Sequence, residues 1–131
     1  MNQLSILLIE DDPDDVELMQ EALKNAEIQY SMKVLGEGNT VLPYLELCKN
    51  FPNVIVLDLN IPKLHGREVL AQLKNSSRFQ DIPVAVLTTA SSQKERDNCL
   101  GAGADIFITK PSTVDGFTKT VEQIIDIAIE N

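Results

Sequence analysis

The chain is poor in basic residues: 11 lysines and arginines stand against 20 aspartates and glutamates, which leaves a net charge of −9. No basic cluster interrupts this acidity, so neither nucleic acid nor an anionic membrane is expected as a direct partner. There are only two cysteines, Cys48 and Cys99, and their wide separation matches no metal-ligand spacing. We therefore interpret both as small, reduced core residues.

Long hydrophobic runs are also missing. The apolar run Leu4–Ile9 is too short for a signal peptide or a membrane span, and no basic segment precedes it. A cytoplasmic location is therefore expected. A glycine-rich turn is absent after this run, where five acids stand between Glu10 and Asp15 instead. That absence argues against a nucleotide-binding domain.

Short apolar runs alternate with helix-like stripes five times along the 131 residues, a length that fits one domain. The clearest run is Asn53–Asp58, which ends in a carboxylate and cannot continue through Pro62 and Gly66. Such a run is typical of a strand buried on both faces of a parallel sheet. The other predicted strands cover Leu4–Ile9, Met32–Leu35, Pro83–Leu87 and Ala104–Ile108.

A helix is predicted after each strand. Pro13 suits the first position of the first helix, where Asp14 and Asp15 are interpreted as residues that complement the helix dipole and stay solvated. Asn39 is a candidate N-cap for the second helix. The fourth, Ser91–Leu100, is mostly polar, and we expect it to be the most loosely packed because helices depend on an apolar face for stability.

Strand–helix alternation predicts an α/β fold: a flavodoxin-like, doubly wound sheet of five parallel strands in the order 2-1-3-4-5, with five helices. That order places the first and third strands side by side. Asp11 and Asp12, which follow the first strand, are then expected beside Asp58, which ends the third. Thr88 and Lys110, after the fourth and fifth strands, are expected on the other side of Asp58.

Carboxylates gathered on one rim repel one another, so one is expected to take up a proton or a cation. Oxygen ligands favour a hard cation such as Mg²⁺. Asp11 or Asp12, together with Asp58 and a backbone carbonyl near Asn60, would form part of its coordination shell.

The remaining rim residues complete a predicted phosphoryl-transfer site. Lys110 would supply a positive charge, Pro111 would fix the turn that aims it, and Thr88 would supply a neutral donor. The Asp58 carboxylate would be the nucleophile and would form an acyl phosphate. A phosphatase of the haloacid dehalogenase type would need a second aspartate where Asn60 stands. His65 is a lone imidazole and is predicted to be an exposed loop residue.

Over essentially its whole length the chain resembles the receiver domain of two-component response regulators. The matching pieces are Glu10-Asp11-Asp12, Asp58-Leu59-Asn60-Ile61-Pro62 with Gly66, Leu87-Thr88-Thr89-Ala90, and Lys110-Pro111. The resemblance implies that Asp58 accepts a phosphoryl group from a sensor histidine kinase or phosphotransfer protein. It also implies that Asp11, Asp12, Asp58 and the Asn60 carbonyl hold Mg²⁺ or Mn²⁺, that Thr88 and Lys110 bind the phosphoryl group, and that Phe107 is the switch aromatic.

The resemblance also suggests how a signal leaves the domain. The predicted single domain, residues 1–131, shows no output module after its last helix, so we expect signalling through contacts with an unidentified downstream protein. The expected face combines the fourth helix, fifth strand and last helix, where Ile127 and Ile129 would widen an apolar surface for a partner or a second copy. The acidic run after the first strand resembles regulators paired with bacterial phytochromes. A receiver-shaped adaptor that works without phosphorylation is the alternative.

Overall fold

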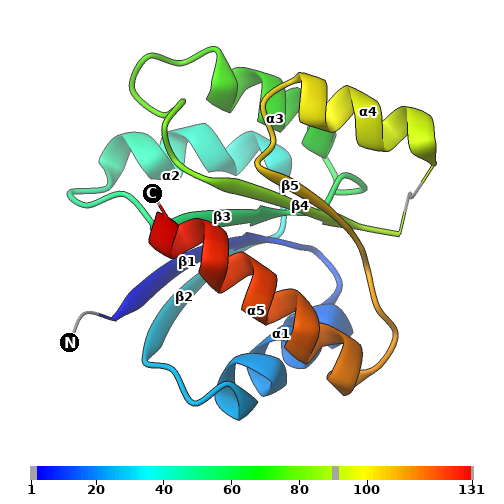
Figure 1. The fold of residues 1–131 in the computed structure, drawn as a ribbon. Helices are drawn as coiled ribbons and strands as arrows, with labels where there is room; N and C mark the ends of the chain where they lie inside the picture. Colours follow the sequence, from blue (N-terminus) through cyan, green and yellow to red (C-terminus); the bar gives the residue numbers. More distant parts are fainter. Residues whose placement is uncertain (1–2, 90–91, 131) are drawn as a thin grey trace.

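A computed structural model of the chain describes residues 3–89 and 92–130. Five parallel strands form its central sheet in the order β2-β1-β3-β4-β5 (Figure 1). The strands are β1 (Leu4–Ile9), β2 (Tyr30–Leu35), β3 (Val54–Leu57), β4 (Val84–Thr88) and β5 (Ile106–Thr109). This topology confirms the predicted doubly wound fold.

Helices cover both faces of the sheet. They are α1 (Pro13–Asn25), α2 (Val41–Leu47), α3 (Gly66–Lys74), α4 (Gln93–Gly101) and α5 (Val114–Glu130), with a short 3-10 helix η1 (Gly38–Thr40) before α2. Figure 1 shows α1 and α5 on one face and α2, α3 and α4 on the other. None of the helices in the described ranges has the length and apolarity needed to cross a bilayer.

The alternation of side chains along the strands builds two hydrophobic cores, one on each face. Ile55 and Leu57 point into the core beneath α2, α3 and α4, whereas Val54 and Val56 point into the core beneath α1 and α5. All four β3 residues are fully buried, and burial of each such side chain stabilises the fold by about 1.5–3 kcal/mol. The strand that ends at Asp58 is therefore held from both sides.

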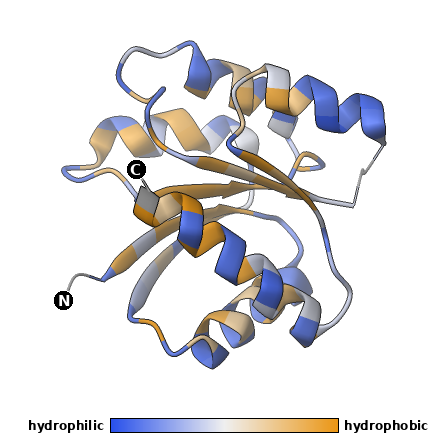
Figure 2. Ribbon diagram, in the orientation of Figure 1, coloured by the Kyte–Doolittle hydropathy of each residue, from blue (hydrophilic) through white to orange (hydrophobic). Residues whose placement is uncertain are grey.

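Helix α4 is the least apolar of the helices in Figure 2. Cys99 is its only buried residue, which agrees with the weak packing expected from its polar sequence. The helix starts after Ser92, whose Oγ accepts a hydrogen bond from the Glu95 N–H at 3.1 Å. The predicted start at Ser91, and Ala90 of the matched motif, lie outside the described residues.

The structure differs from two predictions about the region around α2. Asn39 does not cap α2, because η1 runs directly into the helix and Thr40 occupies the N-cap position. The two cysteines are free, but only Cys99 is a core residue, since Cys48 is half-buried at the end of α2.

Gly66 brings the start of α3 against the segment that follows β3. Its N–H donates to the Leu59 carbonyl at 2.8 Å. A Cβ atom at position 66 would overlap the Asp58 carbonyl oxygen and lie 2.6 Å from the Leu59 Cα. Glycine is required here by close backbone approach, because any side chain would push α3 away from the end of β3.

We expect Gly66→Ala to lower the free energy of unfolding by about 1–3 kcal/mol, as overpacking against rigid backbone does. Gly101→Ala is the matched control, since nothing lies within 4 Å of its added Cβ. The control should be neutral or stabilising by up to about 1 kcal/mol. Urea denaturation of the three proteins measures both effects. Equal stability of the two variants would contradict the close approach at Gly66.

Candidate functional site

The carboxyl ends of β1 and β3 place two acidic residues side by side. The strands pair in parallel with Ile9 opposite Leu57, and the Asp58 N–H donates to the Ile9 carbonyl at 3.1 Å. Glu10 and Asp58 therefore leave the sheet at the same level. Both are buried, with 4% and 6% of their surface exposed, whereas the next residue, Asp11, is exposed.

The ends of β4 and β5 supply a hydroxyl and an ammonium group. Thr88 pairs with Thr109, and the Lys110 N–H donates to the Thr88 carbonyl at 2.8 Å. Thr88 is fully buried, and only 7% of the Lys110 side chain is exposed. Because β4 neighbours β3, these residues lie on the opposite side of Asp58 from β1.

Lys110 joins the acidic residues. Its Nζ donates to Glu10 Oε1 at 2.7 Å, to Asp15 Oδ2 at 2.8 Å and to Asp58 Oδ2 at 3.0 Å. An ammonium group has three N–H donors, so these bonds use its whole donor capacity. Each bond links two ions at short range, which is the strong form of a hydrogen bond.

Burial and pairing act in opposite directions on this cluster. Burial by itself would lower the pKa of Lys110, but the hydrogen bonds to Asp15, Glu10 and Asp58 outweigh it and raise that pKa, so the lysine stays charged. Burial raises the pKa of Glu10, although its bonds to Lys110 and to the Asp12 N–H oppose that rise. The buried lysine therefore offsets part of the cost of burying two carboxyl groups.

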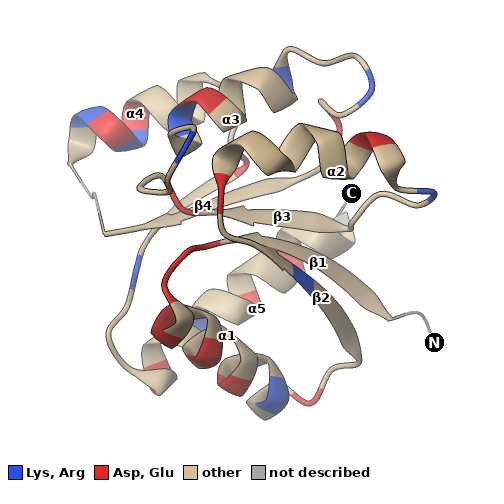
Figure 3. Ribbon diagram, turned by 180° about the vertical axis from the view of Figure 1, so that it is seen from behind, with Lys and Arg blue, Asp and Glu red and all other residues tan. Residues whose placement is uncertain are grey.

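Three acids can share a cation. One carboxylate oxygen from each of Glu10, Asp11 and Asp58 lies within 4.8 Å of the others. An all-oxygen donor set of this kind fits a hard divalent ion such as Mg²⁺ or Mn²⁺. Figure 3 shows the concentration of acidic residues along the loop after β1 and the start of α1.

The membership of this cluster differs from the sequence prediction at one position. Asp12 was predicted to join Asp11 as a metal ligand, but it caps α1, where its Oδ1 accepts from the Asp14 N–H at 2.9 Å. Glu10 takes part in the cluster instead. The signal for Glu10 was its place as the first residue after a buried strand, directly beside Asp58 in the parallel register.

Asp15 was interpreted as a solvated helix-dipole residue, and the structure gives it a further contact. It lies in the first turn of α1 but pairs with Lys110. No sequence signal marks this pair, because the two residues are 95 positions apart.

The other predicted site residues surround this centre. The Asn60 N–H donates to Asp58 Oδ1 at 3.3 Å. Phe107 is buried, its carbonyl accepts from Arg96 Nη1 at 3.1 Å, and the Arg96 guanidinium lies 5.9 Å from its ring centroid. Pro111 is half-buried directly after Lys110. His65 is the N-cap of α3 rather than a free loop residue.

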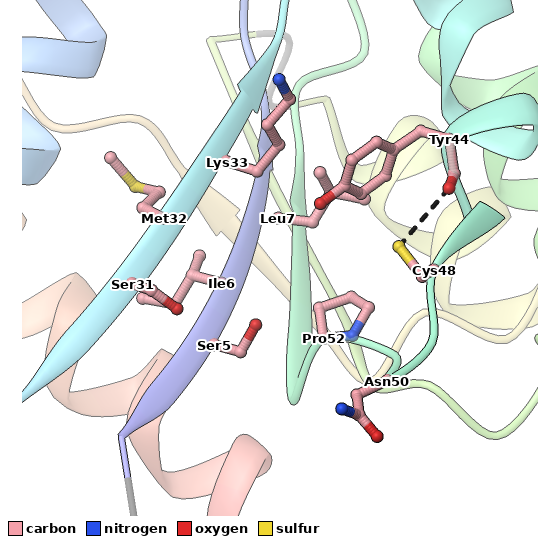
Figure 4. A pocket seen from close by; sticks show the side chains of 10 residues that line it. All are labelled: Ser5, Ile6, Leu7, Ser31, Met32, Lys33, Tyr44, Cys48, Asn50 and Pro52. Carbon is pink, nitrogen blue, oxygen red and sulfur yellow. Dashed lines mark hydrogen bonds between the residues drawn. The ribbon is translucent and has the colours of Figure 1, made fainter.

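A separate pocket lies toward the amino ends of the strands, away from the acids (Figure 4). Its volume is about 250 Å³, and it sits between the β1–β2 pair and the end of α2. On its α2 side, Cys48 Sγ donates to the Tyr44 carbonyl at 3.4 Å, and Lys33 Nζ lies 5.8 Å from the Tyr44 ring centroid. None of these residues contributes to the acid–lysine cluster.

Comparison with known proteins gives consistent similarities. The family described as the response regulator receiver domain matches residues 6–122. Response regulator Rcp1 of Synechocystis sp. is 34% identical over 130 residues, covering 95% of this chain and 88% of Rcp1. The structure of the phosphorylated cyanobacterial phytochrome response regulator RcpA is similar with a TM-score of 0.88, at 30% identity, over 98% of this chain and 95% of RcpA. For the Mn²⁺-bound form of Rcp1, the TM-score is 0.82 at 34% identity, over 92% of this chain and 91% of that one.

The membership of the acid cluster can be tested with two neutralising variants. We expect Glu10→Gln to weaken Mn²⁺ binding about tenfold, because a carboxylate of the cluster is lost. Asp12→Asn should change the affinity less than about threefold, since asparagine preserves the N-cap. Isothermal titration calorimetry measures both constants. A larger loss for Asp12→Asn than for Glu10→Gln would restore Asp12 as the ligand.

Proposed function

Because the chain belongs to the response regulator receiver family, we propose that it is a stand-alone response regulator that accepts a phosphoryl group on Asp58. The donor would be a phosphohistidine of a sensor histidine kinase or of a phosphotransfer protein. One observation carries the proposal: Asp58 is a buried carboxylate that belongs to an acid cluster with the geometry to hold a cation and that also pairs with Lys110.

The transfer itself requires little covalent chemistry from the protein. An Asp58 carboxylate oxygen attacks phosphorus and forms the P–O bond of an acyl phosphate. The P–N bond to the histidine breaks, and the imidazole leaves with its electron pair and takes up a proton. Asp58 is held for this attack by its backbone bond to Ile9 and by the Asn60 N–H on Oδ1. Such positioning is a large part of the catalytic effect in phosphoryl transfer.

Neutralisation of the phosphoryl oxygens is the second requirement. Lys110 already contacts Asp58 Oδ2 and would donate to a phosphoryl oxygen there, with the Thr88 hydroxyl as a further donor. Glu10, Asp11 and Asp58 would hold Mg²⁺, with the Asn60 carbonyl as a further ligand. When bound, the ion would neutralise charge that develops on the equatorial oxygens. The protein would act on no separate substrate, although it would assist its own phosphorylation and dephosphorylation.

A receiver-shaped adaptor that works without phosphorylation would not explain why these charged residues are buried together. A scaffold that binds partners through its surface gains nothing from burying Glu10, Asp58 and Lys110 together, and buried ion clusters are costly to maintain. The similarity to RcpA, described as a phytochrome response regulator, supports a phytochrome-type sensor as the cognate kinase. We propose that the protein acts in the cytoplasm.

Phosphorylation gives the most direct test. Incubation with Mg²⁺ and acetyl phosphate is expected to add one HPO₃ to the wild type, with acid-stable, base-labile character, as seen by intact mass. Asp58→Ala should gain none. Asp126→Asn, which removes an exposed acid on α5, should react like the wild type. No adduct on the wild type, or an equal adduct on Asp58→Ala, would refute the proposed function.

Output is proposed to pass through the face formed by α4, β5 and α5. Thr88 and Phe107 would transmit the change, and a phenylalanine leaves no phenolic hydroxyl for signalling. Of the two isoleucines predicted to widen the apolar surface, Ile127 is half-buried against the α1–α5 core, whereas Ile129 is 73% exposed. Ile129 lies near the amino ends of β1 and β3, in a hollow that Leu4 and Asn53 also line, and is the better candidate for a contact of α5 with a second copy there.

Sedimentation velocity tests this contact. Treatment with Mg²⁺ and acetyl phosphate should shift the wild type toward a dimer, because phosphorylation alters the output face. Ile129→Ser should reduce the shift, since it removes exposed apolar surface, whereas Leu47→Ser removes an even more exposed side chain on α2 and should not. A shift that is the same in all three proteins would place the dimer contact elsewhere.

A further inference from the structure

Asp15 stands apart from the other two acids that hold Lys110. Glu10 and Asp58 both belong to the group of acids that could share a cation, but Asp15 does not. When the site holds a metal ion and a phosphoryl group, one carboxylate oxygen of Glu10 and one of Asp58 would be bound to these groups and would no longer be available to Lys110. Only Asp15 would keep its carboxylate free for the lysine.

The position of Asp15 is well fixed. It is the third residue after the Asp12 N-cap, and its N–H donates to the Asp12 carbonyl at 3.1 Å. The first turn of a helix also stabilises a carboxylate through the unpaired N–H groups of its backbone. With 20% of its side chain exposed, Asp15 loses less hydration than Glu10 or Asp58 does.

Lysine needs such an anchor because its four-carbon stem is flexible and its ammonium is a point charge without a fixed direction. Asp15 contacts Nζ from α1, whereas Glu10 and Asp58 contact it from the ends of β1 and β3. If one N–H is directed toward α1, the tetrahedral ammonium presents its other two donors to the rim.

We propose that Asp15 is a positioning residue for phosphorylation: it holds the Lys110 ammonium through the reaction cycle and directs its two other donors at Asp58 and the incoming phosphoryl group. This inference rests on the proposed function, since it assigns a role within the same reaction. It predicts that removal of the Asp15 carboxylate slows phosphorylation without removing the metal.

The test compares Asp15→Ala with Asp14→Ala. Asp14 is the exposed neighbouring acid in the same helical turn, so both variants lose one first-turn charge. At saturating Mg²⁺, the initial rate of phosphorylation by acetyl phosphate should fall about tenfold in Asp15→Ala, as displaced catalytic groups do. It should stay within about twofold of wild type in Asp14→Ala. Asp15→Glu keeps the carboxylate and should recover most of the rate.

Two further measurements separate positioning from other roles. Thermal unfolding identifies any variant that is not folded, and Asp15→Glu then provides the second folded comparison. The Mn²⁺ dissociation constant of Asp15→Ala should remain within about threefold of wild type. A parallel tenfold loss of Mn²⁺ affinity would make Asp15 part of the metal site and overturn the proposal.

The outcomes also distinguish this inference from the proposed function. A wild type that is not labelled at Asp58 overturns the proposed function. A labelled wild type with equal rates in Asp15→Ala and Asp14→Ala overturns only the role of Asp15. A rate for Asp15→Glu as low as that for Asp15→Ala would also contradict it, because a carboxylate at position 15 would then not suffice to direct Lys110.

Discussion

The constraint on which this structure depends is a single buried ammonium group shared by acids from three elements. Lys110 follows β5, and its partners come from the ends of β1 and β3 and from the first turn of α1. Glu10 and Lys110 are 100 positions apart in the chain. A buried charge that loses its partner is strongly destabilising. The sheet therefore has to bring these strand ends to one level for the acids to be buried at all.

The sheet meets that constraint through its register and through the burial of β3. Ile9 pairs with Leu57, and Thr88 pairs with Thr109, so the residues that follow these pairs emerge on one rim. The carboxyl edge of a parallel sheet is the usual place for a site in such folds because it collects the loops of successive strands. Since β3 is packed from both faces, Asp58 has little freedom to move away from Lys110.

The sequence is sufficient to predict the fold and which strand ends meet at the carboxyl edge of the sheet. Short apolar runs ended by acids, proline or glycine identify strands, and the alternation with helices implies the parallel order. The sequence does not determine which of the consecutive acids after β1 point toward Asp58. Once the chain leaves β1, the alternation of side chains no longer determines which carboxylate points inward. Asp12 is drawn into a local cap by the Asp14 N–H, as short acidic side chains often are, and this leaves the inward place to Glu10.

The contacts of two other polar side chains were not predicted either. His65 looked like a loop residue, yet its Nδ1 accepts from the Arg67 N–H at 3.1 Å and caps α3. Asp15 fits the usual pattern of an acid in the first turn of a helix, and nothing in the sequence indicates its additional ion pair with Lys110. The partner of Asp15 lies 95 positions away, which local propensity cannot indicate, whereas the His65 cap is local but uses a residue that is not among the preferred N-cap types.

Helix α4 is weakly packed and contacts the elements that lead to the site mainly through polar side chains. With Cys99 as its one buried residue, this helix relies on polar contacts. Arg67, just after the β3–α3 loop, binds Glu95 at 2.9 Å, and Arg96 donates to the carbonyl of Phe107 in the strand that leads to Lys110. An ion pair with one exposed partner, such as Arg67, contributes little to stability, whereas burial of apolar surface contributes more. A rearrangement at the two strand ends that carry Asp58 and Lys110 therefore costs less when α4 moves than when α1 or α5 does, because those helices are packed into the core.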